Sequence, residues 1–143
     1  MLLAIDAGNT NIVIAVVDGD DIRAEFRAST KDARTPDEYA VWLSQLMDLE
    51  GLKLASVTGA IIATVVPAAL FILRTLCRKY LKVEPRVIGE PYVDLGIRVN
   101  SDRPEAVGAD RVVNAVAAHM AYQGALIVID FGTATTFDIL APD

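Results

Sequence analysis

A short motif occurs twice in this chain, each time directly after an apolar run. The first copy is IDAGNTN at residues 5–11, and the second is IDFGTAT at residues 129–135. Both copies place an aspartate and then a glycine between two apolar runs, which predicts a strand, a sharp turn and a second strand. The repetition indicates two related domains that each begin with the same hairpin.

Hydrophobic periodicity predicts further elements around the first copy. The run at residues 22–28 alternates apolar and charged side chains, which is the period of a half-buried strand. TPDE at residues 35–38 is a capping box and predicts the start of a helix, with Gly51 as its stop. The predicted elements are successive antiparallel strands over 2–6, 12–17 and 22–28, a helix from 35 to 51, a strand over 59–66 and a helix from Pro67 to about Leu81.

The segment from residue 83 to residue 107 gives mixed signals. Prolines interrupt it, and only RVI at 86–88 and GIRV at 96–99 could form short strands, so it is predicted to be a loop-rich connector. A third helix is predicted directly after Gly108 and ends before Gly124. Strand composition then returns with the second copy of the motif.

The predicted boundary between the two domains lies before residue 125. Residues 1–124 form the first domain, whereas residues 125–143 supply only a strand, a turn and part of a second strand. Two strands cannot bury a hydrophobic face alone. We therefore expect the chain to be the front part of a longer protein with a truncated second domain, or a partner chain to cover the second hairpin.

Composition favours small-molecule chemistry. With 53% hydrophobic residues, a chain of this length can bury one core. A net charge of -6 disfavours a nucleic acid or an anionic membrane as partner, because both attract an excess of lysine and arginine. Cys77 is the single cysteine, so no internal disulfide is expected and a cytoplasmic setting fits. The features of a signal peptide are absent, and Pro67 interrupts the longest apolar run.

The turn of the first hairpin has the features of a phosphate-binding loop. Glycine lets successive backbone N–H groups converge on an anionic oxygen, and Asn9, Thr10 and Asn11 add uncharged donors. Asp6 would repel phosphate directly, so we expect it to hold Mg²⁺ through water. The alternative is that Asp-x-Gly simply closes a hairpin. The second copy favours the phosphate interpretation, because two such turns can grip a polyphosphate from both sides of a cleft.

The order of these motifs resembles that of the sugar kinase, actin and chaperone ATPase superfamily. Within it, DAGNTN, GADR at residues 108–111 and IDFGTATTFD are similar to the motifs of the type III pantothenate kinase family. The resemblance covers the whole chain and implies an α/β, actin-like fold of the ribonuclease H type. Such a fold has a mixed sheet with three antiparallel strands flanked by helices, and it is duplicated in the full-length protein.

This resemblance implies an enzyme that phosphorylates pantothenate with ATP to give 4'-phosphopantothenate, the first step of coenzyme A biosynthesis. It implies Mg²⁺ and a monovalent cation, K⁺ or NH₄⁺, as cofactors. It also implies a cytoplasmic homodimer for the full-length protein, with ATP and pantothenate as its ligands and neither nucleic acid nor membrane as partner. We expect the 143-residue piece alone to be inactive.

The resemblance also implies roles for individual residues. The general base falls on Asp110, and the ligand of the monovalent cation falls on Asp130. The substrate contacts fall on Tyr92, Gly108, Ala109, Asp110 and Arg111. The ATP and phosphate contacts fall on Asp6, Ala7, Gly8, Asn9, Thr10, Asn11, Ile12, Val13, Gly132 and Thr133.

Physical chemistry supports some of these roles and leaves alternatives open. A carboxylate such as Asp110 is needed beside an alcohol that attacks phosphorus in line, but an acid in the first helical turn also suits the helix dipole. Arg111 could hold the substrate carboxylate. Asp130 could be a plain hairpin residue, Tyr92 a packed loop aromatic and Cys77 a small core residue.

Two other functions remain open. Another kinase or phosphatase of the same superfamily, acting on a sugar or polyphosphate, would keep both Asp-Gly hairpins but not GADR. A non-catalytic relative would bind nucleotide without turnover. Loss of Asp6 or Asp110 would have pointed to that relative, and both residues are present.

Overall fold

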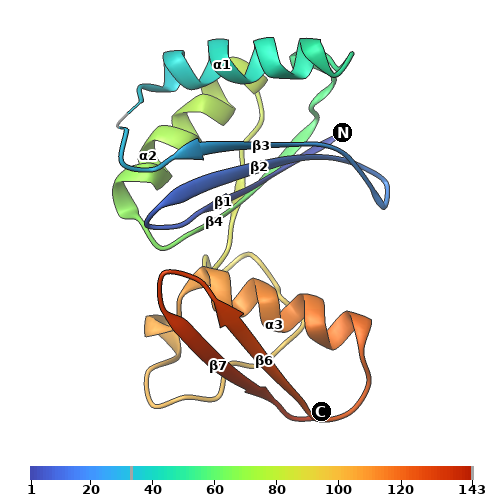
Figure 1. Ribbon diagram of the computed structural model, residues 1–143, viewed down its shortest axis with the longest axis vertical. Helices are drawn as coiled ribbons and strands as arrows, with labels where there is room; N and C mark the ends of the chain where they lie inside the picture. The colour runs from blue at the N-terminus through green and yellow to red at the C-terminus, as the bar shows by residue number, and fades with distance from the viewer. Residues whose placement is uncertain (33, 143) are drawn as a thin grey trace. The chain divides into compact units, whose positions relative to one another are not determined.

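Residues 1–32 and 34–142 are described by a computed structural model of the chain. They form two compact units, Met1–Val87 and Ile88–Asp143, each with its own sheet (Figure 1). The domain boundary that the sequence predicts, before residue 125, remains a prediction. Each unit is described below by itself.

The first unit combines one sheet with two α-helices. Its elements are β1 (Leu2–Ala7), β2 (Asn11–Asp18), β3 (Asp21–Ser29), α1 (Pro36–Leu49), the 3₁₀ turn η1 (Leu54–Ser56), β4 (Gly59–Thr64), α2 (Pro67–Leu76), the π-helical turn η2 (Cys77–Leu81) and β5 (Arg86–Val87). The strands lie in the order β3-β2-β1-β4-β5. β1, β2 and β3 are antiparallel, and β4 is parallel to β1 and β5. The predicted mixed sheet with three antiparallel strands is therefore confirmed.

Helix α1 begins and ends where the sequence predicts. The Thr35 hydroxyl accepts a hydrogen bond from the Glu38 N–H at 3.3 Å, and the Glu38 carboxylate accepts one from the Thr35 N–H at 2.7 Å. This reciprocal pair satisfies donors that the first turn of a helix leaves open. After the helix, Gly51 has a φ of 71°, a left-handed conformation that favours glycine.

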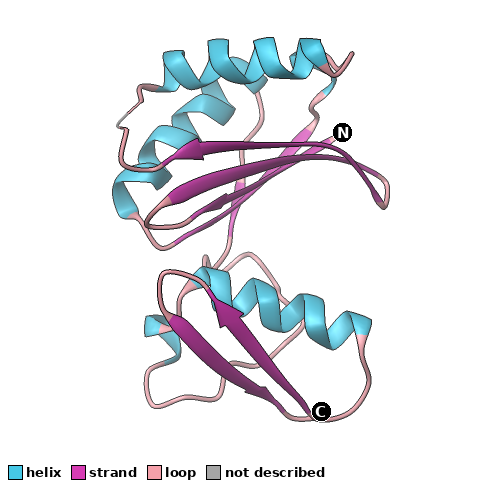
Figure 2. Ribbon diagram, viewed as in Figure 1, coloured by secondary structure: helices cyan, strands magenta, loops and turns pink. Residues whose placement is uncertain are grey.

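The core of the first unit lies between one face of the sheet and both helices (Figure 2). Its fully buried side chains include Leu3, Ile14, Leu43, Ile62 and Leu73. Successive side chains of a strand point to opposite faces. Asp6 follows buried Ile5 and precedes buried Ala7, so it lies on the face away from the helices and is exposed.

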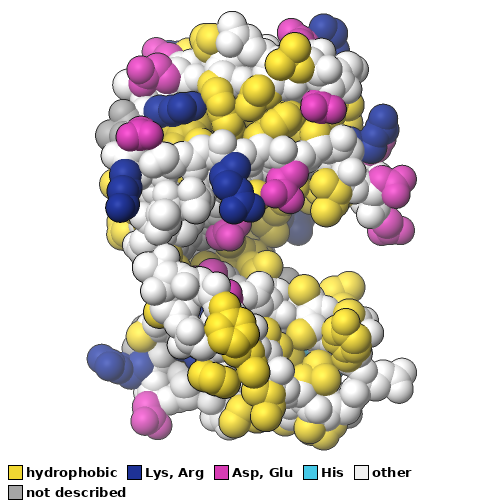
Figure 3. All heavy atoms as spheres, in the orientation of Figure 1, with side chains coloured by type: hydrophobic (Ala, Val, Ile, Leu, Met, Phe, Trp, Pro, Cys, Tyr) yellow, Lys and Arg dark blue, Asp and Glu magenta, His cyan; other side chains and the backbone are white. Residues whose placement is uncertain are grey.

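The second unit contains a helix packed on a hairpin. Its elements are the 3₁₀ turn η3 (Pro104–Ala106), α3 (Ala109–Ala121), β6 (Leu126–Phe131) and β7 (Thr135–Leu140). The strands β6 and β7 are antiparallel, and α3 contacts both, which confirms the predicted third helix and second hairpin. The other face of the hairpin is apolar and exposed, and Figure 3 shows hydrophobic side chains gathered over it. Its large side chains are Ile127, Ile129, Phe131, Phe137 and Ile139.

The connector between β5 and α3 is mostly irregular, as predicted. Of the two segments that could form short strands, RVI contributes β5, whereas GIRV (96–99) forms no strand. Gly96 adopts a φ of 67°, and its N–H donates to the Asp94 carboxylate at 3.0 Å. An aspartate that binds the backbone two residues on makes a turn, which competes with an extended strand.

The second predicted helix is less regular than expected. It begins at Pro67, but α2 ends at Leu76 and the π-helical turn η2 continues it to Leu81. Lys82 then adopts a left-handed conformation with a φ of 59°, which stops the helix. Within residues 1–32 and 34–142, every helix is too short or too polar to cross a membrane.

Truncation of Leu73 tests the core of the first unit. Leu73→Ala removes a fully buried side chain of α2, so we expect the free energy of unfolding to fall by about 2–5 kcal/mol. Phe71→Ala on the same helix removes a ring that is 75% exposed. This control should change the free energy of unfolding by about 0.5 kcal/mol or less. Urea unfolding followed by circular dichroism measures both, and equal losses would contradict the assigned core.

Candidate active site

The turn between β1 and β2 is tied to the neighbouring strand β3. Within the turn, the Gly8 N–H donates to the Asn11 carbonyl at 3.0 Å. Thr30, directly after β3, donates from its hydroxyl to the Gly8 carbonyl at 2.8 Å. Its N–H donates to the Thr10 carbonyl at 2.9 Å. Thr30 therefore holds two carbonyls of the turn and fixes its shape.

Not every residue of the predicted phosphate loop, residues 6–13, can offer its side chain to a ligand. The exposed side chains are those of Asp6, Asn9, Thr10 and Asn11. Ala7 is 0% exposed and Ile12 is 2% exposed, because both face the core. Any contact of Ala7 or Ile12 with a phosphate is therefore restricted to backbone groups.

The glycine of each hairpin is not required by the backbone of this chain. Gly8 and Gly132 both lie outside the left-handed region. Among the described residues, a Cβ at Gly8 would come no closer than 3.5 Å to another atom, and one at Gly132 no closer than 3.6 Å. These are ordinary contact distances. A ligand that must approach the backbone closely gives a physical reason for both glycines that the fold does not supply.

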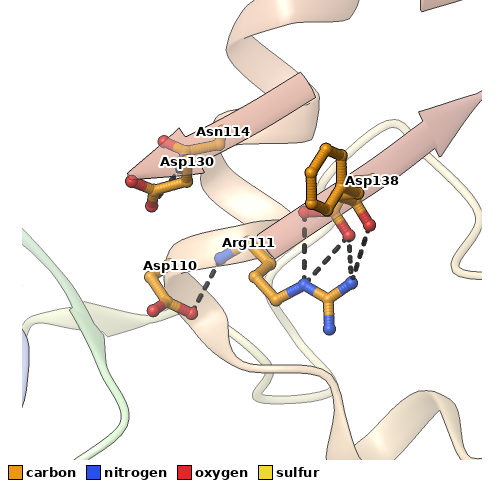
Figure 4. A network of polar contacts seen from close by, with 6 residues as sticks. Asp110, Arg111, Asn114, Asp130 and Asp138 are labelled. Atoms are coloured by element: carbon orange, nitrogen blue, oxygen red, sulfur yellow. Dashed lines mark hydrogen bonds and ion pairs between the residues drawn. The ribbon is translucent and has the colours of Figure 1, made fainter. Parts of the chain in front are cut away.

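Carboxylates and an arginine gather between the start of α3 and one face of the second hairpin (Figure 4). Asp110, Arg111 and Asn114 come from α3, Asp130 from β6 and Asp138 from β7. Alternate residues of each strand face the helix, and both aspartates occupy such positions. The structure thus brings together three predicted site residues within the second unit. The predicted phosphate loop belongs to the first unit.

Arg111 and Asp138 form the strongest contact in this cluster. Nε of Arg111 donates to the two carboxylate oxygens of Asp138 at 2.9 and 3.2 Å, and Nη2 donates to Oδ1. The side chain of Arg111 is 38% exposed and that of Asp138 is 16% exposed. These hydrogen bonds raise the pKa of Arg111 above its usual value. A two-pronged pair of this kind sets the plane of the guanidinium as well as its position.

Asp110 lies in the first turn of α3, directly after Gly108 and Ala109. Its Oδ1 accepts a hydrogen bond from the Arg111 N–H at 2.8 Å. In the described part of the chain, its Oδ2 receives none. A half-buried carboxylate with one oxygen anchored and the other available can accept a proton from a bound hydroxyl. Asp110 also suits the helix dipole, so the geometry allows both interpretations.

Asp130 and Thr136 form an oxygen-rich spot beside the second turn. Oδ2 of Asp130 accepts a hydrogen bond from Asn114 at 3.4 Å, and Oδ1 lies 3.6 Å from where a Cβ of Gly132 would be. Thr136 is directly opposite Asp130 in the hairpin. Its hydroxyl oxygen is buried and has no hydrogen-bond partner among the described residues. Carboxylate and neutral oxygens are ligands that bind hard cations.

A preformed site for a divalent metal is not found. In residues 1–32 and 34–142, no group of three or more His, Cys, Asp or Glu side chains could hold a metal ion. Mg²⁺ in phosphoryl-transfer enzymes is bound by one or two carboxylates together with substrate phosphates and water. The single exposed carboxylate of Asp6 fits that mode of binding.

Tyr92 is accessible. Its side chain is 66% exposed, and its hydroxyl contacts the Glu90 carboxylate. Tyr92 is therefore not packed in the part of the chain that the structure describes, and its role as a substrate contact stays a prediction. Thr133 is also exposed, in the turn between β6 and β7.

Sequence reasoning missed the residues that support the site. Asp138 and Asn114 carried a local signal: Asp138 interrupts an apolar strand at an inward position, and Asn114 shares a helix face with Arg111 three residues before it. Thr30 carried none, nor did Thr64, whose hydroxyl donates to the Ala7 carbonyl at 2.9 Å. Both threonines act on residues far away in the sequence.

Comparison with known proteins gives one consistent family. A family model described as type III pantothenate kinase matches residues 2–143. A protein named type III pantothenate kinase from Paramagnetospirillum magneticum is 64% identical over 143 residues, which is 100% of this chain and 55% of that protein. One of the same name from Rhodospirillum rubrum is 62% identical over 140 residues, which is 98% of this chain and 54% of that protein. The chain thus spans about half the length of the curated relatives it matches.

Solved structures share the fold at low sequence identity. A candidate 2-dehydro-3-deoxygalactonokinase from Sinorhizobium meliloti matches with a TM-score of 0.57 and 16% identity, over 99% of this chain and 50% of that one. A candidate N-acetylglucosamine kinase from Porphyromonas gingivalis matches with a TM-score of 0.50 and 16% identity, over 99% of this chain and 45% of that one. These matches concern the fold alone. They confirm the predicted α/β, actin-like fold, and its duplication remains a prediction.

Cys77 is a core residue rather than a nucleophile, as the sequence analysis allowed. It is 0% exposed, and burial raises the pKa of its thiol to about 12. The thiolate is the reactive form, so a raised pKa lowers reactivity at any pH below it. We expect the native chain at pH 8 to react with a thiol reagent about 10³-fold more slowly than the chain unfolded in guanidinium, where the pKa returns to its ordinary value. Release of thionitrobenzoate measures both rates, and equal rates would contradict the burial of Cys77.

Proposed function

The chain belongs to the type III pantothenate kinase family, and on this basis we propose that the full-length protein transfers the γ-phosphoryl group of ATP to pantothenate. The product is 4'-phosphopantothenate, the first intermediate of coenzyme A biosynthesis. The observation that carries the proposal is the family match over residues 2–143. The cluster at the start of α3 supports it, because a substrate with a hydroxyl and a carboxylate requires a base and a cationic side chain.

Asp110 is the general base of the proposed reaction. Its Oδ2 accepts the proton of the primary hydroxyl of pantothenate as the hydroxyl oxygen attacks the γ-phosphorus in line. A bond forms between these two atoms, and the bond from the γ-phosphorus to the β–γ bridging oxygen breaks. ADP leaves with the electron pair of that bond. The hydrogen bond from the Arg111 N–H to Oδ1 holds the carboxylate in position.

The two glycine turns bind the phosphates of ATP in this proposal. The proposed phosphate contacts of the first unit are backbone N–H groups and exposed side chains of residues 6–11, and those of the second unit are Gly132 and Thr133. Asp6 would hold Mg²⁺ through water, and the metal when bound neutralises phosphate charge. Thr30 keeps the first turn in one shape before ATP arrives.

Asp130 would hold the monovalent cation, K⁺ or NH₄⁺. We propose Thr136 as a second ligand, since its buried hydroxyl oxygen has no other partner among the described residues. A cation there supplies positive charge near the second glycine turn. The substrate contacts are those of GADR, with Arg111 on the carboxylate of pantothenate and the exposed ring of Tyr92 as a further contact.

The second actin-like domain begins at residue 125 in this proposal. Alignment of IDAG with IDFG makes Ile129 and Phe131 the counterparts of Ile5 and Ala7, which face helices in the first unit. In the second unit Ile129 is 47% exposed and Phe131 is 82% exposed. Polypeptide corresponding to the unmatched half of the relatives would cover this apolar face. We expect the full-length protein to be a cytoplasmic homodimer. Light scattering, which gives the molar mass in solution, tests whether it is a dimer.

An ADP-release assay on the full-length protein tests the proposed activity. We expect turnover with pantothenate and not with glucose, and higher turnover in K⁺ than in Na⁺. Asp110→Asn should lower kcat by about 10²- to 10⁴-fold, because it removes the base but leaves the phosphate-binding turns intact. Its affinity for ATP should be unchanged in a binding titration. Asp102→Asn, at an exposed carboxylate of the same unit, is the matched control and should keep normal turnover.

The same assay separates the alternatives. Turnover with a sugar but not with pantothenate would favour another kinase of the same fold. Binding of ATP without turnover of either substrate would favour a non-catalytic relative. A near-normal rate for Asp110→Asn would remove this residue from the mechanism.

Substitution of Gly8 tests the first turn as a phosphate-binding loop. Gly8→Ala adds a Cβ at an ordinary contact distance of 3.5 Å from the Asn11 carbonyl oxygen, and Gly8 lies outside the left-handed region, so the free energy of unfolding should change by less than about 1 kcal/mol. The added methyl group lies where a phosphate must approach, so the KM for ATP should rise about tenfold or more. Gly19→Ala in the turn between β2 and β3, where φ is 62°, is the converse control. It should lower stability by roughly 1 kcal/mol and leave the KM for ATP unchanged.

A further inference from the structure

Asp138 holds one edge of the Arg111 guanidinium and leaves another edge open. Nε and Nη2 of Arg111 both donate to Asp138, and Nη2 also donates to the Phe137 carbonyl at 3.4 Å. Within the described residues, Nη1 makes no hydrogen bond, and Figure 4 shows this third nitrogen directed away from Asp138. A guanidinium has five N–H donors in a fixed plane, so the N–H groups of Nη1 can donate to a second carboxylate while Nε and Nη2 stay bound.

The position of Asp138 in the hairpin argues for a role beyond packing. It occupies an inward position of β7, and its side chain is only 16% exposed. A partly buried ion pair is weak evidence for stability, because removal of two charges from water offsets most of their attraction. Replacement of such a pair by hydrophobic residues of similar volume is often neutral or stabilising. The pair does, however, fix the orientation of a long and otherwise mobile side chain.

We propose that Asp138 is a positioning residue for Arg111, presenting Nη1 to the carboxylate of pantothenate. This inference rests on the proposed function and adds a specificity determinant to it. The side chain of Arg111 loses its conformational entropy when the protein folds, so little more is lost when the substrate binds. With its carboxylate on Arg111, pantothenate presents its hydroxyl to Asp110, the neighbouring residue on α3. The length of pantothenate sets the distance between its carboxylate and that hydroxyl. Asp138 itself touches no substrate.

The test compares pantothenate with pantothenamide, in which a neutral amide replaces the carboxylate. Asp138→Asn in the full-length protein keeps the shape of the side chain but loses its charge and one acceptor. We expect the KM for pantothenate to rise about tenfold while kcat changes less than about threefold. The preference for pantothenate over pantothenamide, as a ratio of kcat/KM, should fall about tenfold. A purely structural defect would lower both values of kcat/KM equally and leave this preference intact.

Further variants control for folding and for coupling. Asp138→Glu keeps the ion pair but moves the guanidinium by one methylene, so it should fold and should still lose several-fold of the preference. Arg111→Lys should lose the preference, and adding Asp138→Asn to it should change the preference by less than about twofold, because the two residues act as one unit. Asp102→Asn should behave as wild type.

The outcomes distinguish a failure of the proposed function from a failure of the role proposed for Asp138. Absence of pantothenate turnover by the wild-type protein would overturn the proposed function and this inference together. Normal turnover with an unchanged preference in Asp138→Asn or Asp138→Glu would overturn the inference alone. A lower KM for pantothenate in Asp138→Asn would also overturn it, because Asp138 would then compete with the substrate for Arg111.

Discussion

The two-residue period of a β-strand decides where the proposed site residues lie. In β1, Ile5 and Ala7 bury their side chains under the helices, which forces Asp6 to the opposite face. In β6 and β7 the same alternation turns Asp130 and Asp138 towards α3. A shift of one residue in the first hairpin would bury Asp6 in an apolar core. A shift of one residue in the second hairpin would turn Asp130 and Asp138 away from α3. The buried apolar residues thus determine on which face of the sheet each carboxylate lies.

The two glycine turns complement this arrangement. Neither Gly8 nor Gly132 is demanded by a left-handed backbone or by crowding among the described residues, in contrast to Gly51, which closes α1 with a positive φ. Thr30 and Thr64 hold the carbonyls of the first turn, so its backbone is ordered without a ligand. If the turn binds phosphate as proposed, little conformational entropy is lost on binding, because the backbone is already ordered.

Local patterns predicted much of the fold and part of the site. Alternation, the Asp-Gly turn and the capping box at Thr35 marked the strands and the first helix correctly, because each depends on hydrogen bonds or side-chain spacing within a few residues. The sequence left open whether GIRV forms a strand, and it forms none because a turn at Asp94 and Gly96 competes locally with an extended backbone. The exposure of Tyr92 depends on which other segments pack against its loop, and no pattern near Tyr92 contains that information.

The sequence alone determined the two hairpins, their aspartates and glycines, and the GADR motif at the start of a helix, because these features rest on near neighbours in the chain. Only the tertiary structure decided the partners of those residues. Arg111 pairs with Asp138, 27 residues further on, and Gly8 is held by Thr30, 22 residues further on. Such contacts form only when the packing of a helix on a sheet, or of one strand beside another, brings distant segments together.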